Sequence, residues 1–400
     1  MTVSSRRRFL SFLAASPAIA WAQQISPEQS NTVITSAQEA LNVQDFEEIA
    51  QHKLPPAHWG YLSTGVDDDR TTKANMAAYG RIELRPRRLV DISRTDIRTE
   101  LFGTVFDAPI FLCPASYQSM FHPDAELGTA HAARAKNTMQ ILSAGTSVAY
   151  EEVAKARGVA PWYQFDMPLR WEDTEKTMKR VEDAGCPVLV MTVDVFAGRN
   201  AETQLRLSRT DTRDCLGCHV TSNAGRITLR PGSEPMTDGV EPYGRNPQRP
   251  TWQDVERLKK LIKMKLVLKG IETREDARLS REHGVDAIEV SNHGGRATED
   301  LRATIDSLPE VIDGAGSQMK ILIDGGVRHG ADVYKALALG ASAVGIGRPY
   351  LYGLSAFGQE GVERVLDILR TELLITMRGC GTPTLAAITP ASVAKVPRAR

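Results

Sequence analysis

Short apolar runs return eight times along the chain, separated by longer charged segments. Most of the runs are continuously apolar instead of alternating with polar residues, which is typical of parallel β-strands buried on both faces. The intervening segments, such as 273–284 and 329–340, have helical spacing and close with glycine, a common helix stop. The predicted strands lie in residues 109–116, 138–143, 161–165, 187–194, 265–270, 287–292, 320–325 and 343–348.

Eight strand–helix units favour a closed (β/α)8 barrel, the TIM-barrel architecture. The alternative, an open doubly wound sheet, predicts a glycine-rich phosphate turn after the first strand, and Pro114-Ala115-Ser116-Tyr117 is not one. The spacing is interrupted once, after the fourth strand. Residues 200–250 there are rich in Arg, Gly, Pro, Asp and Thr, and we interpret them as a long inserted loop over the active face.

The amino terminus has a different character from the rest of the chain. Three arginines, Arg6–Arg8, precede a short apolar run that ends in Ala20-Trp21-Ala22, as in a secretory signal peptide. Ser5-Arg6-Arg7-Arg8-Phe9-Leu10 is similar to the twin-arginine export signal. We expect a signal peptide at 1–22, a linker at 23–40 and a periplasmic mature protein. A frayed basic terminus is the less favoured alternative.

We expect one domain at 41–390 and a tail at 391–400. Composition narrows the classes of partner and site that this chain can have. The 400 residues carry 49 basic and 49 acidic side chains, so net charge gives no reason to expect nucleic acid or a membrane surface as partner. Five cysteines do not make a disulfide framework in a chain this long. No run is apolar for long enough to remain as a stable membrane span. We predict no metal site.

Polar residues end most of the predicted strands. In (β/α)8 enzymes the chemistry takes place at the carboxyl ends of the strands. One polar residue at such an end is usually a solvated loop start, but a full rim of them defines a candidate site. The run at 287–292 is followed by His293-Gly294-Gly295-Arg296, so we infer that this strand places His293 and Arg296 at the barrel mouth. The polar strand ends are Ser143, Gln164, Thr192, Asp194, Lys269, His293, Asp324 and Arg348.

Four segments together resemble the FMN-dependent 2-hydroxy-acid oxidase and dehydrogenase family, of the glycolate oxidase, lactate dehydrogenase and mandelate dehydrogenase type. They are SNHGGR, LVLKG, TVD and the long IDGGVRHGADVYKALALGA…VGIGRP. The resemblance covers roughly residues 40–385. It implies FMN as cofactor and oxidation of a 2-hydroxy acid to the 2-keto acid, with oxygen, a quinone or a cytochrome as electron acceptor. A phosphate-binding barrel of another chemistry is the alternative, and SNHGGR argues against it.

The resemblance also implies catalytic roles. His293 would be the base that takes a proton from the substrate, since an imidazole titrates near neutral pH. Arg296 would bind the substrate carboxylate in a bidentate fork. Asp194 would orient His293 and stabilise its protonated form, and Tyr61 would contact the substrate.

For the cofactor, the resemblance implies three groups of residues. Lys269 would stabilise the negative charge of reduced flavin. The loops after the last two strands would hold the ribityl chain and phosphate; a surface salt bridge between Asp324 and Arg328 is the alternative. The backbone of Pro114–Ser116 would pass near flavin N5. The complete cofactor set is Pro114, Ala115, Ser116, Ser143, Gln164, Thr192, Lys269, Ser291, Asp324, Gly326, Arg328, Gly347 and Arg348.

Four positions depart from the family pattern. Asp166 stands where a second active-site tyrosine is usual. Since a carboxylate repels a carboxylate substrate, Asp166 must point away, be protonated or bind another substrate group. Gly145 replaces a bulkier residue and is expected to enlarge the pocket. Ser116 stands in place of Ala or Gly, and Ala297 in place of Gln, so glycolate or lactate is not the default substrate.

The inserted loop contains Cys215-Leu216-Gly217-Cys218-His219, the attachment pattern of covalent haem c. A Cys215–Cys218 disulfide ranks first and haem second, because no cytochrome-sized domain surrounds the motif. A zinc site short of ligands and coincidence are also open. Cys113 and Cys380 are expected to be buried thiols.

Two functions of different class follow. The first is an enzyme, and export favours a dehydrogenase that passes electrons to a quinone or a periplasmic cytochrome. The second is a flavin- or solute-binding protein that lost turnover through Asp166. The presence of His293, Arg296, Asp194 and Lys269 favours the enzyme. The family often assembles as homo-oligomers, and the resemblance extends this expectation to the present chain.

Overall fold

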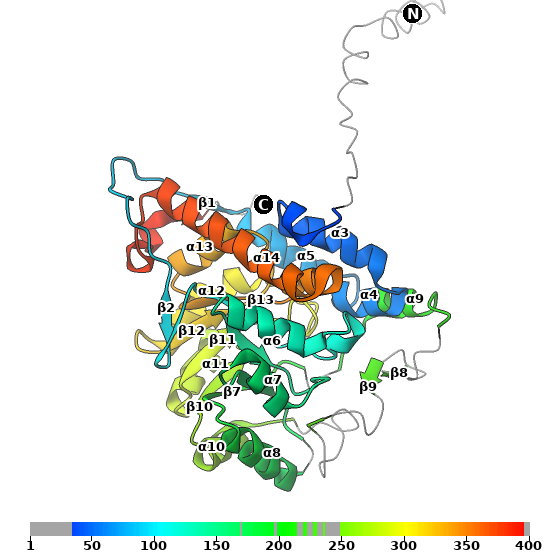
Figure 1. The fold of residues 1–400 in the computed structure, drawn as a ribbon. Coiled ribbons are helices and arrows are strands. Elements are labelled where there is room, and N and C mark those ends of the chain that lie inside the picture. The colour runs from blue at the N-terminus through cyan, green and yellow to red at the C-terminus, as the bar shows by residue number, and fades with distance from the viewer. Residues whose placement is uncertain are drawn as a thin grey trace, which may run out of the picture. The chain divides into compact units, whose positions relative to one another are not determined.

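Eight parallel strands form a closed barrel in the computed structural model (Figure 1). The model describes residues 34–168, 170–195, 198–213, 219–221, 227–229, 235–236 and 249–395. Each barrel strand lies within one of the eight apolar runs, and β13 closes on β4. The (β/α)8 prediction is therefore confirmed, and the open sheet is wrong. The barrel strands are β4 Ile110–Leu112, β5 Met139–Leu142, β6 Trp162–Phe165, β7 Val188–Thr192, β10 Lys265–Lys269, β11 Ala287–Val290, β12 Lys320–Ile323 and β13 Ala343–Ile346.

Helices connect the strands and surround the barrel. They are α6 Ala125–Ala135, α7 Tyr150–Arg157, α8 Trp171–Asp183, α10 Trp252–Leu261, α11 Arg274–Glu282, α12 Thr304–Ala315, α13 Gly330–Ala338 and α14 Arg348–Cys380. Local signals in the sequence explain α11 and α13, the two helices predicted at 273–284 and 329–340. Thr273 accepts a hydrogen bond from the Asp276 backbone at the start of α11, and Gly340 follows α13 with a φ of 108°. Within the described residues, none of the helices has the length and apolarity needed to cross a membrane.

Elements before the first barrel strand cover both ends of the barrel. The helices are α3 Val43–Lys53, α4 Pro56–Ser63 and α5 Arg70–Tyr79. The hairpin of β2 Thr99–Leu101 and β3 Thr104–Phe106 contributes Leu101 and Phe106 to the buried cluster that contains Phe111 and Trp162. This hairpin therefore closes the barrel interior at the end opposite the candidate site, while α4 brings Tyr61 to that site.

Three segments differ from the sequence-based boundaries. In the predicted linker, η1 Ala37–Glu39 buries Ala37, and Ala40 is buried as well. In the predicted tail, β14 Val393–Lys395 pairs with β1 Ile82–Leu84. The inserted segment is more than a loop, since it contains α9 Glu202–Ser208 and the pair β8 His219–Thr221 and β9 Ile227–Leu229. These segments consist largely of small or polar residues, so their composition did not predict that they form ordered elements. The predicted signal peptide lies outside the described residues.

The barrel interior changes character along its axis. Inward-facing positions alternate along each strand, and toward the amino ends they are apolar, as in Val188, Val190 and Val267. Continuing the same alternation toward the carboxyl ends places polar side chains inside. The register sets Lys269 beside Thr192 on one neighbouring strand and beside Glu289 on the other. The pattern that buries the core therefore also aims polar groups at the barrel mouth.

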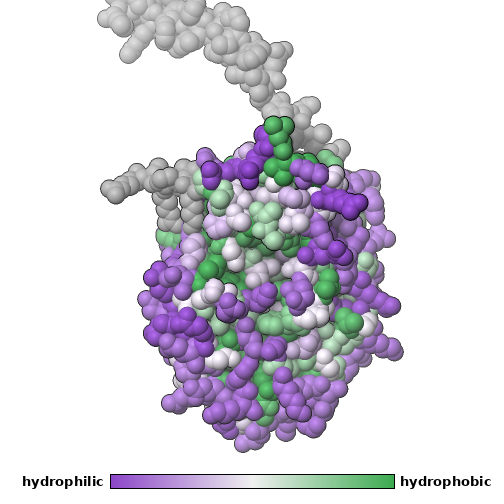
Figure 2. Space-filling model, turned by 90° about the vertical axis from the view of Figure 1, so that its left-hand side faces the viewer, coloured by the Kyte–Doolittle hydropathy of each residue, from purple (hydrophilic) through white to green (hydrophobic). Residues whose placement is uncertain are grey.

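The outer face shown in Figure 2 is mostly hydrophilic, with small apolar patches separated by polar side chains. The large apolar residues that are most exposed are distant in sequence, such as Leu41, Leu89 and Ile375. Isolated exposed apolar residues are ordinary on a protein surface. The chemistry-bearing features are instead inside the barrel mouth.

Candidate active site

A cavity of about 640 Å³ lies at the carboxyl ends of the barrel strands. It brings together residues that are up to 290 positions apart, from Tyr61 on α4 to Leu351 in the first turn of α14. Two predicted residues, Asp194 and Ser291, lie behind the wall and bond to residues that line it. The predicted residues in the wall are Tyr61, Pro114, Ala115, Ser116, Ser143, Gln164, Asp166, Thr192, Lys269, His293, Arg296, Asp324, Gly326, Arg328, Gly347 and Arg348.

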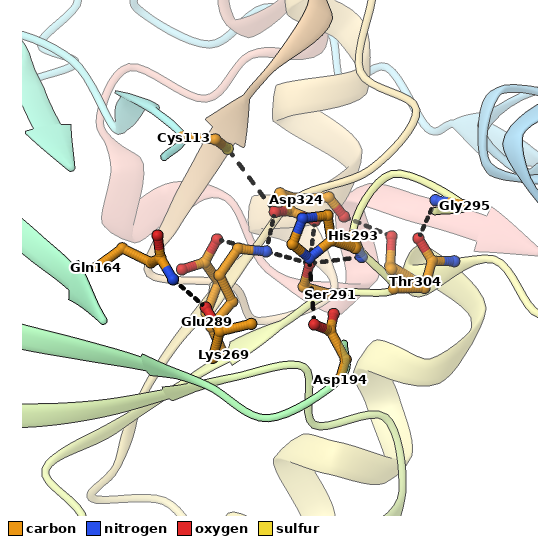
Figure 3. A network of polar contacts seen from close by, with 12 residues as sticks. Cys113, Gln164, Asp194, Lys269, Glu289, Ser291, His293, Gly295, Thr304 and Asp324 are labelled. Carbon is orange, nitrogen blue, oxygen red and sulfur yellow. Dashed lines mark hydrogen bonds and ion pairs between the residues drawn. The ribbon is translucent and has the colours of Figure 1, made fainter. Parts of the chain in front are cut away.

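His293 and Asp194 form a pair at the cavity wall (Figure 3). The imidazole Nδ1 lies 3.1 Å from Asp194 Oδ1. Asp194 is mostly buried, and it fits because Gly270 follows the lysine strand: a Cβ at Gly270 would lie 2.7 Å from the Asp194 Cβ. When Asp194 accepts a hydrogen bond from the Nδ1–H of neutral His293, the other ring nitrogen carries a lone pair, which is what a base requires.

The loop that carries His293 is held in an uncommon backbone conformation. His293 has a φ of 57°, in the left-handed region that non-glycine residues rarely adopt. Asn292 fixes the loop from below, since its side chain accepts a hydrogen bond from the Gly295 backbone and exchanges hydrogen bonds with Asn75 on α5. This network explains how the strained residue is kept in place.

Lys269 is buried at the centre of a second network. Its ammonium donates to Asp324 at 2.8 Å and to the Ser291 hydroxyl, and Ser291 donates in turn to Asp324 at 2.7 Å (Figure 3). Burial would lower the pKa of Lys269, but the carboxylates of Asp324 and Glu289 raise it above its usual value. The lysine therefore stays charged. Asp324 pairs with Lys269 inside the barrel, so the surface salt bridge with Arg328 is wrong.

A hydrogen-bonded arc runs along the rim across four strands. Ser116 and Ser143 hydroxyls lie 2.9 Å apart, and Ser143 donates to the Gln164 side-chain oxygen at 2.9 Å. The Gln164 amide then donates to Thr192 and to Asp166, each at 2.9 Å. Asp166 therefore faces the cavity and does not point away from it. Burial is the main factor that raises the pKa of Asp166.

Arg296 and Arg348 bind the carboxyl end of α4 through backbone carbonyls. Arg296 Nη1 donates to the carbonyls of Tyr61 and Thr64, and its guanidinium carbon lies 4.8 Å from the centre of the Tyr61 ring. Arg348 donates to the carbonyls of Leu62, Thr64 and Gly294 at 2.9–3.1 Å. Among the described residues neither guanidinium forms an ion pair, and burial lowers the pKa of both.

Comparisons with known proteins agree with this geometry. The model of the FMN-dependent dehydrogenase family matches residues 50–395. The chain belongs to this family. A peroxisomal (S)-2-hydroxyacid oxidase of Arabidopsis thaliana is 38% identical over 353 residues, which cover 87% of this chain and 95% of that protein.

Two further relatives have names that denote other activities on 2-hydroxy acids. The L-lactate dehydrogenase (cytochrome) of Wickerhamomyces anomalus is 33% identical over 357 residues, 88% of this chain and 61% of that protein. The solved structure of a mandelate oxidase variant with (S)-mandelic acid is 30% identical and superimposes with a TM-score of 0.79. The match covers 90% of this chain and 100% of the mandelate oxidase chain. The protein is therefore an FMN-dependent oxidoreductase that oxidises 2-hydroxy acids.

The residues around the cavity fit FMN. At one side the loops after β12 and β13 supply Arg328 and Arg348, which suit a phosphate. Gly326 has a φ of 82° and a Cβ there would lie 2.2 Å from the Asn75 carbonyl oxygen, so this loop packs directly on α5. At the other side, Lys269 and the Ser143–Gln164–Thr192 arc offer the mixture of donors and acceptors that the edge of a flavin ring requires.

Gly145 does not enlarge the cavity, contrary to the sequence-based expectation. A Cβ at Gly145 would lie 2.6 Å from the Ser116 hydroxyl oxygen and 3.4 Å from the Tyr117 ring. The Ser116 side chain therefore occupies the space that Gly145 leaves. The two departures from the family pattern compensate each other, and the pocket is not opened at this point.

Several cavity residues were missed in the sequence. Arg199 comes from the segment that follows β7, and Tyr117 and Phe121 stand 5.9 and 6.2 Å from the Tyr61 ring. Glu289 lies inside an apolar run and escaped notice, although an acidic residue within a buried strand is itself a signal. Cys113 and Cys380 are buried as expected. Cys215 and Cys218 lie outside the described residues, and of His219 only the backbone is described.

Proposed function

We propose that the protein is an exported 2-hydroxy-acid dehydrogenase that works in the periplasm, with His293 as its base. The observation that carries the catalytic part is the convergence of the His293–Asp194 pair, Arg296 and Lys269 on one cavity. The twin-arginine pattern at Ser5–Leu10 supports the export.

Each residue has a distinct task in this proposal. Arg296 uses its Nη1 protons on α4 carbonyls, so Nε and Nη2 remain for a bidentate contact with the substrate carboxylate. Arg199 adds a second positive charge to the same wall. Tyr61 stacks against Arg296 and orients the substrate. The carboxylate is thereby held on one side of the cavity, and the hydroxyl-bearing carbon is directed toward His293.

His293 then accepts the proton that the substrate releases, through the ring nitrogen that faces the cavity. Asp194 keeps the tautomer with a proton on Nδ1 and stabilises the imidazolium that forms. FMN, when bound, takes up the two electrons of the oxidation. Lys269, held charged by Asp324, stabilises negative charge that develops on the cofactor side of the cavity.

Replacing His293 tests the central assignment. His293→Gln should leave the purified protein yellow, because the residues that hold FMN are intact, and should lower kcat by roughly 10²–10⁴. His52→Gln, on the exposed side of α3, is the matched control and should behave as the wild type. Turnover of His293→Gln within a few-fold of wild type would exclude His293 as the base.

Export and the choice of acceptor have tests of their own. Changing Arg6 and Arg7 together to lysine should keep the protein in the cytoplasm, as cell fractionation would show; periplasmic location of this variant would contradict the twin-arginine assignment. A dehydrogenase should reoxidise faster with a quinone or a cytochrome than with dissolved oxygen, which stopped-flow absorbance of the reduced flavin would measure.

The Cys215–Cys218 pair remains a disulfide in this proposal, since the periplasm is oxidising. Thiol alkylation followed by mass spectrometry should label both cysteines only after reduction. A covalent haem would instead appear as a mass increase that persists after reduction, with a Soret absorption band. These two results separate the first-ranked and second-ranked interpretations.

A further inference from the structure

Glu289 is a fully buried carboxyl group that the mechanism above does not use. It faces the barrel interior from β11, in register with Lys269 on one side and Leu322 on the other. Its side chain is 0% exposed, and among the residues that the structure describes neither carboxylate oxygen has a hydrogen-bond donor. The Lys269 ammonium is 3.6 Å away and is already bonded to Asp324 and Ser291.

The surroundings of Glu289 contain more negative than positive groups. Lys269 faces it from β10, Asp324 from the end of β12, Cys113 from the end of β4 and Asp194 from the end of β7. One carboxylate oxygen of Glu289 and one of Asp324 lie within 4.8 Å of each other and of the Cys113 sulfur. With Glu289 ionised, a single ammonium would face two adjacent carboxylates in a dry interior, which is unfavourable.

A proton on Glu289 resolves both problems. It removes the surplus negative charge and supplies an O–H donor next to Asp324. The pKa of Glu289 is raised to about 8, first by burial and then by Asp324, against the opposing effect of Lys269. Asp324 shows the reverse behaviour, since contact with Lys269 lowers its pKa despite burial. The proton therefore resides on Glu289 and the negative charge on Asp324.

We propose that Glu289 is a positioning residue that takes up and releases a proton in response to the charge of the bound flavin, acting through Lys269. The proposal rests on the placement of FMN beside Lys269 given above. Above the pKa that Glu289 has beside oxidised flavin, its carboxylate is ionised. When two electrons then reach the flavin and negative charge grows next to Lys269, Glu289–COO⁻ takes one proton from solvent and becomes Glu289–COOH. The proton returns to solvent on reoxidation. No other bond is made or broken, and the electrons come from the 2-hydroxy acid.

The sign of the effect on flavin potential follows from linkage. Added negative charge raises the pKa of Glu289, so the reduced holoenzyme binds this proton more tightly than the oxidised one. At pH 6 Glu289 is protonated in both states and contributes no pH dependence. Above the oxidised-state pKa, reduction takes up one proton, and the potential falls more steeply with pH. One proton per two electrons corresponds to about 30 mV for each tenfold change in proton concentration.

The experiment compares wild-type holoenzyme with Glu289→Gln, which has the shape of the protonated acid and cannot ionise. The midpoint potential of bound FMN is measured by spectroelectrochemistry from pH 6 to pH 9.5, without any hydroxy acid. The two proteins should have equal potentials at pH 6 and diverge above pH 8, with the wild type lower and its slope steeper by up to the value above. The two proteins differ only at residue 289, so the difference between their curves isolates the contribution of the Glu289 carboxyl group.

Parallel curves across the whole range would overturn the proposal, whether they coincide or are offset, because a structural role moves the potential equally at every pH. Glu289→Leu serves if Glu289→Gln does not retain FMN, since an apolar side chain of similar volume is often tolerated at a buried charge; the same divergence is expected. Glu126→Gln is the matched control. It removes a buried carboxyl whose pKa is raised to about 7 mainly by burial on α6, and should keep the wild-type slope.

Failure here is distinguishable from failure of the proposed function. The potentials are read without substrate, so they do not depend on whether His293 is the base. Conversely, the His293→Gln result does not depend on the protonation of Glu289. A wild-type slope in Glu289→Gln with inactive His293→Gln would overturn the present inference alone.

Discussion

The cavity holds two kinds of enclosed cation, and their surroundings are opposite. Lys269 lies between two acidic side chains, the Asp324 carboxylate at 2.8 Å and the carboxyl group of Glu289 at 3.6 Å. Arg296 and Arg348 are held by neutral carbonyl oxygens at the carboxyl end of α4, and among the described residues no carboxylate lies within ion-pair distance of either guanidinium. The charge of Lys269 is thus balanced by a direct ion pair, whereas the two arginines have hydrogen bonds to carbonyl oxygens in place of one.

This difference indicates which ligand each cation meets. A flavin ring is neutral when oxidised, so the cation beside it must be balanced by the protein itself. Substrate carboxylate and FMN phosphate carry their own negative charge, and an unbalanced guanidinium binds them without first breaking an internal ion pair. The protein therefore neutralises the cation beside the flavin ring with its own carboxylate. The cations that meet the substrate carboxylate and the FMN phosphate are neutralised by those ligands.

The largest expected effect comes from removing the balanced cation. Lys269→Met leaves Asp324 buried without its partner, and breaking a buried ion pair typically costs about 3–5 kcal/mol. The free energy of unfolding, measured in urea, should fall by that order. Lys269→Met/Asp324→Asn should recover part of the loss, because it removes both charges. Lys265 is exposed on the same strand, so Lys265→Met should lower the free energy of unfolding far less. An equal decrease in Lys269→Met and Lys265→Met would show that the buried Lys269–Asp324 pair contributes no more than an exposed ion pair.

Removing the phosphate-side arginine should have the next largest effect. Arg348→Met should weaken FMN binding by roughly 10–100-fold, because a hydrogen bond to a charged group contributes about 1.5–3 kcal/mol. Riboflavin, which has no phosphate, should bind the variant and the wild type more nearly alike. Fluorescence titration of both flavins measures this. Equal weakening for the two flavins would mean that Arg348 only supports α4.

Arg296→Lys tests the substrate-side cation. An ammonium provides charge but not the planar fork, so we expect kcat/KM for the hydroxy acid to fall about tenfold, with FMN binding unchanged. Arg302→Lys, in the same loop but ion-paired with Glu310, is the matched control. The neutral methyl ester of the substrate should show a much smaller difference between variant and wild type. If acid and ester respond alike, Arg296 does not bind the carboxylate.

The eight strands and most of the cavity wall could be predicted because they depend on local sequence. Buried strands must be apolar, and polar residues at their carboxyl ends all lie at the same end of the barrel. The register also follows once the barrel closes, which is why Lys269 and Asp324 meet although 55 residues separate them. These features follow from chain topology. Arg296 and Arg348 could be placed at the rim in the same way, because each lies just after a barrel strand in the sequence.

The remaining features depend on contacts between distant residues. A missing side chain at Gly145 suggested open space, but Ser116 fills it from another strand. Arg199 and α9 belong to a segment whose path over the mouth is set by packing on α4, where Gly60 lies against Leu207. Glu289 was hidden because an apolar run was treated as uniformly apolar. Charge balance at Lys269 was invisible until both carboxylates were placed around it.

Asp166 gives the smallest expected effect, because it alters which substrate is preferred and not the reaction. It lines the cavity, yet its Oδ1 accepts a hydrogen bond from Gln164, so only its second oxygen is left for a ligand. A 2-hydroxy acid with an additional hydroxyl or a cationic group can donate to that oxygen, whereas the single hydroxyl of lactate is directed to His293 in the proposed function. One such hydrogen bond contributes about 0.5–1.5 kcal/mol, which corresponds to a change of roughly 2–10-fold in relative specificity.

Asp166→Tyr should therefore raise the ratio of kcat/KM for lactate to that for a larger hydroxylated 2-hydroxy acid by that factor. Asp166→Asn separates charge from hydrogen bonding, because it keeps an acceptor for Gln164 and removes the negative charge. If the carboxylate repels small substrates through its charge, Asp166→Asn should shift the ratio in the same direction as Asp166→Tyr. If both variants keep the wild-type ratio, Asp166 serves to hold Gln164 in the rim arc, and substrate choice lies with Tyr117 and Phe121 instead.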